Sequence, residues 1–284
     1  MPRLRLIASV AVLVLAGCGA GSGDDSSRQV VASFYPLEYA AQQVGGTVDV
    51  TNLTPPGAEP HDIELTARDV ARTQEADVVL YVDSEFQPAV EDAVRGARGT
   101  AIDLLEGVQL RNAPDEEKRA DPHIWLDPVL YAGVVREIGR ALAAGKRVDT
   151  MTTRLHRLDR EFREGISSCE RREIVTSHAA FGYLAARYGL RQVPIAGVSP
   201  EAEPTPRALE SAVRRVRQSG ATTVFFETLV SPRVAETVAR ETGARTAVLN
   251  PIEGLTKDQA AHGDDYFTIM RRNLAALRSA LGCR

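Results

Sequence analysis

The stretch VDTMTTRLHRLDREFREGI, residues 148–166, decides the architecture of this 284-residue chain. Its apolar side chains recur every three or four residues, at Val148, Met151, Leu155, Leu158, Phe162 and Ile166. This period is typical of an amphipathic helix with one buried stripe. At 1.5 Å per residue, about 20 residues span about 30 Å, which is roughly the size of a lobe. We therefore expect a long helix, and we disfavour a coiled-coil dimer because fewer than about four heptads are present.

Strand-like runs alternate with helical segments on both sides of this helix. They cover residues 29–35, 48–53, 76–82 and 99–104 before it, and residues 172–178, 191–198, 221–227 and 244–250 after it. Apolar, β-branched runs without strict alternation indicate strands buried on both faces, as in parallel sheets covered by helices. The prediction is an α/β fold with two lobes, each a mainly parallel sheet flanked by helices, joined by one long backbone helix. The N-terminal lobe covers 29–127, the linking helical segment 128–168, and the C-terminal lobe 169–284.

The chain start, MPRLRLIASVAVLVLAGC, indicates where the protein works. Arg3 and Arg5 precede an apolar run over residues 6–16, a pattern typical of a secretory signal peptide, predicted here as residues 1–17. The run is too short to span a bilayer core of about 30 Å. The sequence LAGC resembles a bacterial lipobox, which implies lipidation of Cys18; a signal peptide that merely ends near a cysteine is the alternative. With residues 18–28 as a flexible tether, we expect an exported lipoprotein anchored to the cell membrane on its extracytoplasmic side.

Charge and cysteine content narrow the function classes. Loss of the signal peptide removes two of the 34 basic residues and takes the formal net charge from −4 to −6, which disfavours nucleic acid as a partner. Once Cys18 is lipidated, Cys169 and Cys283 are the remaining cysteines. A pair of cysteines in an exported chain favours a disulfide, whereas two unpaired thiols remain the alternative because spacing does not reveal geometry.

Four side chains that could bind a metal fall in loops that follow strands or enter helices. His61 lies in TPPGAEPHDIEL (54–65), His123 in DPHIWLDP (121–128), His178 in VTSHAAFGYLA (175–185) and Glu253 in LNPIEGLT (249–256). Loops at the carboxyl ends of parallel strands carry the chemistry of α/β folds, so two residues from each half are expected to converge. Three imidazoles and one carboxylate suit tetrahedral zinc. Ligands from distant loops leave no short regular signature, so the spacing alone is weak evidence.

Longer motifs carry a family resemblance from about residue 28 to the C-terminus. They are GAEPHDIELTARDV, DPHIWLDP, TSHAAFGYLAARYGL, GVSPEAEPTPRAL, FFETLVSP and LNPIEGLT. Together they resemble the metal-binding lipoproteins of ABC transporters, in particular the zinc-importing branch. The resemblance implies two α/β lobes joined by a single backbone helix, a metal held in the cleft between them, and delivery of that metal to a membrane permease.

Carried over to this chain, the family's ligand positions fall on His61, His123, His178 and Glu253. The manganese branch tends to place a carboxylate at the third position and an aspartate at the fourth, so zinc is favoured over manganese. Many zinc importers also carry a long histidine-rich loop between the first two ligands. The corresponding LRNAPDEEKRAD (110–121) is short, acidic and free of histidine, which puts an accessory metal-collecting role in doubt.

Other residues near the motifs receive supporting roles or none. The two Asp-Pro steps around His123 are expected to hold a non-helical loop, with Asp127 as the N-cap and Pro128 as the first residue of the long linking helix, and Trp125 packed beneath. Glu59, two residues before His61, is a candidate to approach the metal, or else keeps its loop solvated. Glu203 and Glu227 are candidates to accept hydrogen bonds from ligand imidazoles, or else are ordinary charges at the cleft rim. His156, on the charged face of the long helix, and His262, in the polar run AAHGDDY, are not expected to be primary ligands.

Three other functions remain as alternatives to zinc import. An enzyme is disfavoured because four protein ligands close the zinc shell and no H-E-x-x-H motif is present. A manganese-binding importer component, or a surface adhesin with a structural zinc site, is the alternative reading within the same family. We expect a monomer that works with a metal ABC permease and the membrane.

Overall fold

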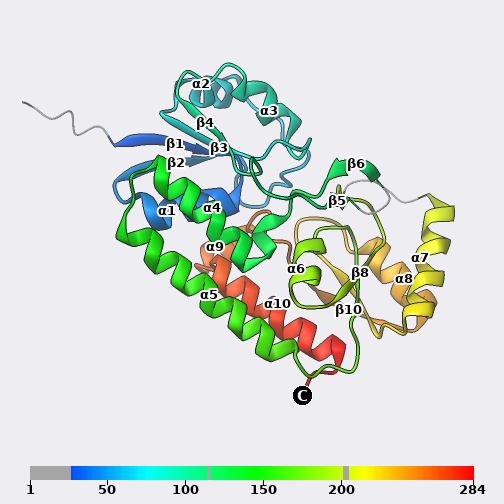
Figure 1. Ribbon diagram of the computed structural model, residues 1–284. Coiled ribbons are helices and arrows are strands. Elements are labelled where there is room, and N and C mark those ends of the chain that lie inside the picture. Colours follow the sequence, from blue (N-terminus) through cyan, green and yellow to red (C-terminus); the bar gives the residue numbers. More distant parts are fainter. Residues whose placement is uncertain (1–26, 114–115, 201–204) are drawn as a thin grey trace, which may run out of the picture.

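The computed structural model describes residues 27–113, 116–200 and 205–284. It contains two four-stranded sheets whose neighbouring strands are all parallel. The first has the order β2(Val48–Asn52)-β1(Arg28–Ala32)-β3(Val78–Tyr81)-β4(Thr100–Asp103). The second has the order β10(Arg245–Val248)-β9(Thr223–Phe226)-β7(Glu173–Thr176)-β8(Arg191–Pro194). Each strand of these two sheets falls within one of the predicted runs or, for β1, starts one residue before it, and the predicted α/β fold with two parallel sheets is confirmed (Figure 1).

The central strands are buried on both faces, which explains their continuous apolar runs. Val79 and Leu80 in β3, and Ile174 and Val175 in β7, have no exposed surface. Because the strands within each sheet are parallel, their carboxyl ends meet at one edge of that sheet. The loop after β2 of the first sheet and the loops after β7 and β10 of the second carry three of the predicted ligands.

Helices cover both sheets. The first half contains α1(Tyr35–Gly45), α2(Ala67–Glu75) and α3(Pro88–Val94), and the second half contains α6(Gly182–Arg187), α7(Pro206–Ser219), α8(Arg233–Thr242), α9(Lys257–Ala261) and α10(Tyr266–Leu281). Between the sheets, β5(Asn112–Ala113) and β6(Glu116–Ala120) form an antiparallel pair in the stretch described above only as a short loop, and a 3₁₀ turn, η1(Ile124–Leu126), follows it. In the described ranges, no helix combines the length and the apolar character needed to cross a membrane.

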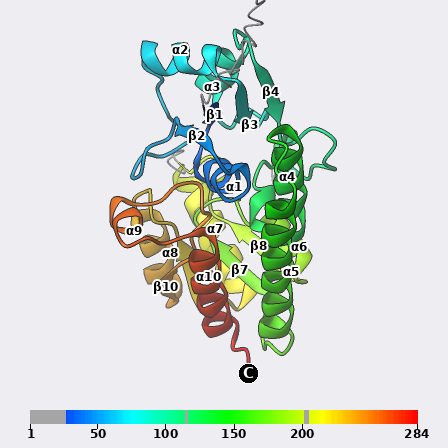
Figure 2. The same ribbon diagram turned by 90° about the vertical axis from the view of Figure 1, so that its left-hand side faces the viewer.

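The linking segment consists of two helices, α4(Pro128–Ala141) and α5(Lys146–Ile166). One long helix was expected to begin at Pro128, but the predicted apolar stripe belongs to α5 alone. Asp127 is the N-cap, as expected, and accepts from the backbone N–H groups of Val129 and Leu130, but the helix that it caps is α4. The turn between the helices places Ala143 and Gly145 at positive φ, so the chain reverses direction there and α4 packs along α5 (Figure 2). The sequence pattern did not separate these two helices.

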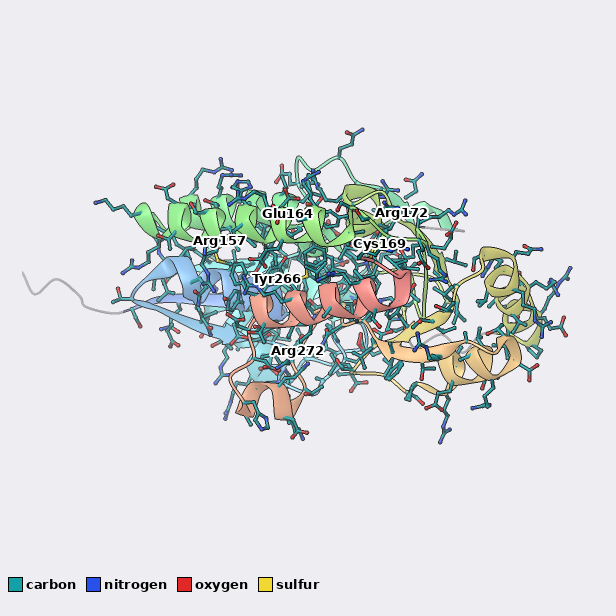
Figure 3. The ribbon with its side chains drawn as sticks, turned by 90° about the horizontal axis from the view of Figure 1, so that it is seen from below. Arg157, Glu164, Cys169, Arg172, Tyr266 and Arg272 are labelled. Carbon is teal, nitrogen blue, oxygen red and sulfur yellow. A yellow bond between two sulfur atoms is a disulfide. The ribbon has the colours of Figure 1, made fainter. Side chains whose placement is uncertain are left out.

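One hydrophobic core extends through both halves of the molecule. It includes Phe34 and Trp125 from the first half, Leu155 and Phe162 from α5, and Tyr266 from α10. The predicted stripe of α5 from Met151 to Ile166 is buried. Helices α5 and α10 lie side by side over this core (Figure 3), so the two sheets share their apolar interior.

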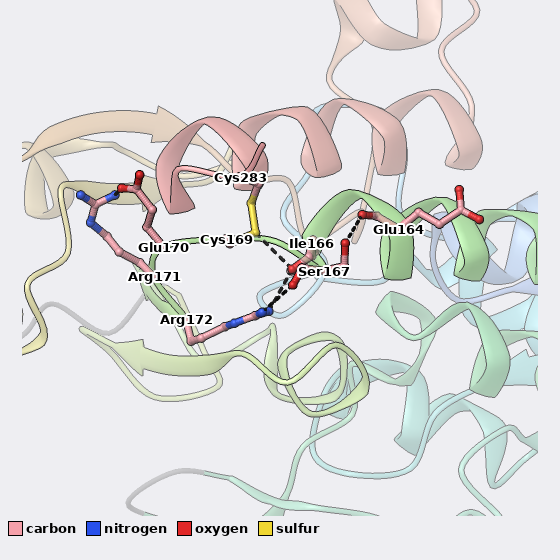
Figure 4. The surroundings of a disulfide bond; sticks show 8 residues. All are labelled: Glu164, Ile166, Ser167, Cys169, Glu170, Arg171, Arg172 and Cys283. Atoms are coloured by element: carbon pink, nitrogen blue, oxygen red, sulfur yellow. Dashed lines mark hydrogen bonds and ion pairs between the residues drawn. A yellow bond between two sulfur atoms is a disulfide. The ribbon is translucent and has the colours of Figure 1, made fainter.

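A disulfide bond joins the ends of α5 and α10. Cys169 follows α5 and Cys283 follows α10, and their sulfur atoms are bonded (Figure 4). The guanidinium group of Arg172 donates to the carbonyl oxygens of Ile166 at 2.9 Å and Ser167 at 3.0 Å. These bonds satisfy carbonyl groups that the last turn of a helix leaves without partners. The disulfide holds the C-terminal end of the chain against the end of α5.

Candidate metal centre

The structure brings together the four residues proposed as metal ligands. One atom of each of His61, His123, His178 and Glu253 lies within 4.8 Å of the corresponding atoms of the other three. The loop between β2 and α2 carries His61, and His123 is the N-cap residue of η1. His178 and Glu253 lie in the loops that follow β7 and β10. All four side chains are buried, with His61 the most exposed at 8%.

The imidazole Nε2 atoms converge on the carboxylate of Glu253. The distance to Glu253 Oε1 is 2.9 Å from His123 Nε2 and 3.3 Å from His178 Nε2. His61 Nε2 lies 3.7 Å from Glu253 Oε2. Three nitrogen atoms and a carboxylate around one point form a donor set that suits a tetrahedral divalent cation.

The opposite ring nitrogens of two imidazoles are held by buried carboxylates. His123 Nδ1 lies 2.7 Å from Asp121 Oδ1, and His178 Nδ1 lies 2.7 Å from Glu227 Oε1, which also accepts from Ser177 Oγ. Such bonds fix the ring orientation and leave Nε2 to face a metal. Glu227 was among the candidates for this role. Asp121 was missed, although its place two residues before His123 in DPH was the available signal.

His61 is held differently. Within the described ranges, neither of its ring nitrogens has a hydrogen-bond partner, although both are buried. Its ring packs against Phe86, with 4.4 Å between ring centroids. A buried polar atom without a partner is costly, and a cation at the centre of the cluster would satisfy Nε2. The unpaired atom therefore supports the fit of a metal at this site.

Glu59 lies beside the cluster without accepting from an imidazole ring. Its Oε1 accepts from the backbone N–H of His61 at 3.1 Å, while its Oε2 is buried and has no partner among the described residues. Burial, together with the negative charge of Glu253, raises the pKa of Glu59 to about 9. The third candidate, Glu203, lies outside the described residues, as does Cys18.

The charges in the cluster are strongly coupled. Burial opposes protonation of His123, but its bonds to Asp121 and Glu253 outweigh burial and raise its pKa. For His178, burial is likewise outweighed, by Glu227 and Glu253, and the pKa lies well above 6.5. Burial lowers the pKa of His61. Burial would raise the pKa of Glu253, but the three imidazoles outweigh it and hold the pKa well below the usual value.

Trp125 fixes the loop that carries His123. The two rings lie 5.1 Å apart between centroids, and Trp125 Nε1 donates to the carbonyl oxygen of Pro251 at 2.7 Å. The hydroxyl group of Tyr266 donates to the backbone oxygen of Trp125, also at 2.7 Å. These contacts connect the His123 loop to the segment just before Glu253, so ligands from the two halves share a rigid support.

The two remaining histidines lie outside the cluster. His156 is on α5 with its Nε2 3.5 Å from Arg136, and His262 at the end of α9 bonds through Nδ1 to the carbonyl oxygen of Asp258. Neither joins the group of four.

The family model described as zinc-uptake complex component A, periplasmic (ZnuA), matches residues 30–280. The chain belongs to the ZnuA family. The high-affinity zinc uptake system protein ZnuA of Bacillus subtilis is 35% identical, over 95% of this chain and 94% of that protein. The zinc-binding lipoprotein AdcA of Streptococcus pneumoniae is 33% identical over 96% of this chain, which spans only 60% of AdcA.

Solved structures of similar proteins share this fold. The Zn(II)-bound ZnuA-like domain of S. pneumoniae AdcA has a TM-score of 0.76 at 34% identity, over 90% of this chain and 99% of that one. Lmb of Streptococcus agalactiae, described as a laminin-binding protein with adhesin and metal transporting activity, has a TM-score of 0.81 at 28% identity, over 90% of this chain and 99% of that one.

Proposed function

We propose that this protein binds Zn²⁺ on the extracytoplasmic side of the membrane and delivers it to the permease of an ABC transporter for import. The observation that carries the proposal is the closed set of three imidazole nitrogens and one carboxylate, formed by His61, His123, His178 and Glu253. Membership of the ZnuA family and the zinc-binding relatives support zinc as the cargo.

The geometry of the four ligands favours metal transport over catalysis. Four protein ligands fill a tetrahedral shell, whereas catalytic zinc keeps a position open for water or substrate. The ligands come from both halves of the chain, so bound metal crosslinks the two lobes and stabilises their closed arrangement. The shared core and the paired helices α5 and α10 limit the motion to small shifts of loops and lobes.

The proposal includes a membrane anchor at Cys18, supported by LAGC and by the lipoprotein name of the AdcA relative. The tether would let the folded body, a monomer, reach the permease. Replacement of Cys18 by alanine should release the protein from the membrane fraction; unchanged retention would contradict lipidation at this residue.

Metal analysis and calorimetry test the zinc site. Protein purified without added metal should contain zinc, and zinc should displace manganese in competition. Alanine at His61, His123 or His178 should weaken zinc binding by at least roughly 100-fold, and alanine at Glu253 by less, because water can replace a carboxylate ligand. His156→Ala and His262→Ala are the matched controls. Near-wild-type affinity in the three histidine variants, or preferential retention of manganese, would refute the assignment.

A further inference from the structure

A polar cavity of about 850 Å³ opens beside the segment that follows His123, and none of the four candidate metal ligands lines it. Its wall combines residues 109–112 of the first half, the start of α4, the end of α5, and α6 of the second half. Arg111, Arg163 and Arg187 line it, one from each of three segments, and Asp127 is the only acid among the described lining residues. The chain as a whole has more acidic than basic residues, 38 against 34, so this concentration of guanidinium groups is a local feature.

Asp127 pairs with Arg187 and Asp159 pairs with Arg163, so two of the three guanidinium charges are partly offset. The Oδ1 of Asp127 caps α4, its Oδ2 accepts from Arg187 Nε at 2.7 Å, and its side chain is only 4% exposed. On the α5 side, Arg163 Nε donates to Asp159 Oδ2 at 2.9 Å. Both arginines thus use Nε for these bonds, and as far as the described residues go their Nη groups remain for another acceptor. The side chain of Arg187 is 26% exposed and that of Arg163 is 51% exposed, so solvent and solutes reach both.

We propose that this cavity binds a small multivalent oxyanion, such as an organic polycarboxylate or a phosphate compound. Planar guanidinium forks match the paired oxygens of carboxylate and phosphate groups, and charge-assisted bonds of this kind are about twice as strong as neutral ones. The cavity is larger than one carboxylate group requires, and its three arginines come from different segments. A ligand with several anionic groups would therefore engage more of them than a monovalent anion.

The site is distinct from the zinc cluster and does not depend on the proposed transport function. The nearest link is Tyr183, which lines the cavity, donates to the backbone oxygen of Asp121 at 3.0 Å and accepts from the backbone N–H of Arg111 at 2.9 Å. Arg163 lies on α5, and its bond in the described structure is to Asp159 of the same helix and not to the ligand-bearing loop. Its replacement should therefore leave zinc binding intact.

The test is calorimetry on the full chain freed of metal, at constant ionic strength set with sodium chloride. The probes are tricarballylate, a tricarboxylate, together with inorganic phosphate and acetate. Tricarballylate should bind saturably with one site per chain, and acetate at least roughly tenfold more weakly. Absence of saturable tricarballylate binding would overturn the proposal, as would equal affinity for acetate.

Variants locate the site. Arg163→Gln and Arg111→Gln, which lie in different segments of the lining, should each weaken tricarballylate binding roughly tenfold, and Arg163→Gln should leave zinc affinity unchanged. Arg157→Gln is the matched control, because Arg157 is an exposed residue of the same helix outside the cavity lining (Figure 3). Since Arg163→Gln leaves Asp159 unpaired, thermal melting checks its fold, and Arg111→Gln provides an independent measurement. An equal loss in Arg157→Gln, or no loss in either cavity variant, would show diffuse attraction and refute a built site.

Discussion

At the scale of single residues, the proposed ligands differ in what holds them. His123 and His178 each bond a buried carboxylate through Nδ1, whereas neither ring nitrogen of His61 has a hydrogen-bond partner in the described part of the chain. His61 is also the most exposed of the four side chains in the cluster. The site thus combines two preoriented imidazoles with a third whose orientation depends on its loop and on the metal.

Asp121 and Glu227 should matter for zinc affinity without touching the metal. Asp121→Asn and Glu227→Gln keep the side-chain size but weaken acceptance from Nδ1, so each should lower zinc affinity about 10- to 100-fold. Competition with a fluorescent zinc chelator measures the change. Asp62→Asn is the control, because Asp62 is an exposed carboxylate next to His61. Wild-type affinity in both test variants would mean that these bonds do not orient the ligands.

Zinc affinity should fall as the pH is lowered, beginning above the ordinary histidine pKa of 6.5. In the metal-free protein the pKa values of His123 and His178 are raised, and zinc binds the deprotonated rings. Protons therefore compete below these raised values, and the competition disappears above them. Calorimetry in buffers of different ionisation enthalpy should detect proton release on zinc binding. An affinity that stays constant from pH 8 to pH 6 would contradict this.

At the scale of elements, the close approach of α4 and α5 depends on one glycine. A Cβ atom at Gly139 would lie 2.2 Å from Val148 Cγ2 of α5, so the helices could not keep their present separation. The backbone there is helical, so the reason for glycine is space and not conformation.

Gly139→Ala should destabilise the protein by about 1–3 kcal/mol through overpacking. Gly133 is also in α4, but no neighbouring atom lies within 4 Å of the position that a Cβ atom would take there. Gly133→Ala should therefore be neutral or stabilise by up to about 1 kcal/mol, since alanine favours helix. Urea denaturation monitored by circular dichroism gives both values. If the two substitutions had the same effect, packing between α4 and α5 would not be the cause.

At the scale of the whole molecule, covalent and apolar contacts tie the chain together around the candidate site. The core runs through both halves, and the Cys169–Cys283 bond closes a loop with a sequence separation of 114 residues. Closing so long a loop restricts the unfolded chain, which stabilises the folded state.

Replacement of both Cys169 and Cys283 by serine should lower the free energy of unfolding by about 2–4 kcal/mol. Zinc affinity should stay unchanged, because the bond lies at the ends of α5 and α10 and away from the loops that carry the ligands. Unfolding of the wild type with and without reductant is the internal control. Two titratable thiols in the denatured, unreduced wild type would show that the bond is not formed.

Local pattern was enough to predict the strands of the two parallel sheets and the buried stripe of α5, because period and β-branching report on the burial of each segment by itself. The candidate ligands could also be identified from the sequence, because their loops resemble those of a known family and follow strand ends. The division between α4 and α5 was not predicted, because the packing of Gly139 on Val148 involves two faces that meet only after folding. The role of Asp121, the lack of hydrogen-bond partners for the His61 ring nitrogens among the described residues and the arginine-lined cavity were not predicted either, because each depends on contacts that form only on folding. His123 and Glu253 are 130 residues apart, and the distance between such residues depends on how the sheets pack, which no local period encodes.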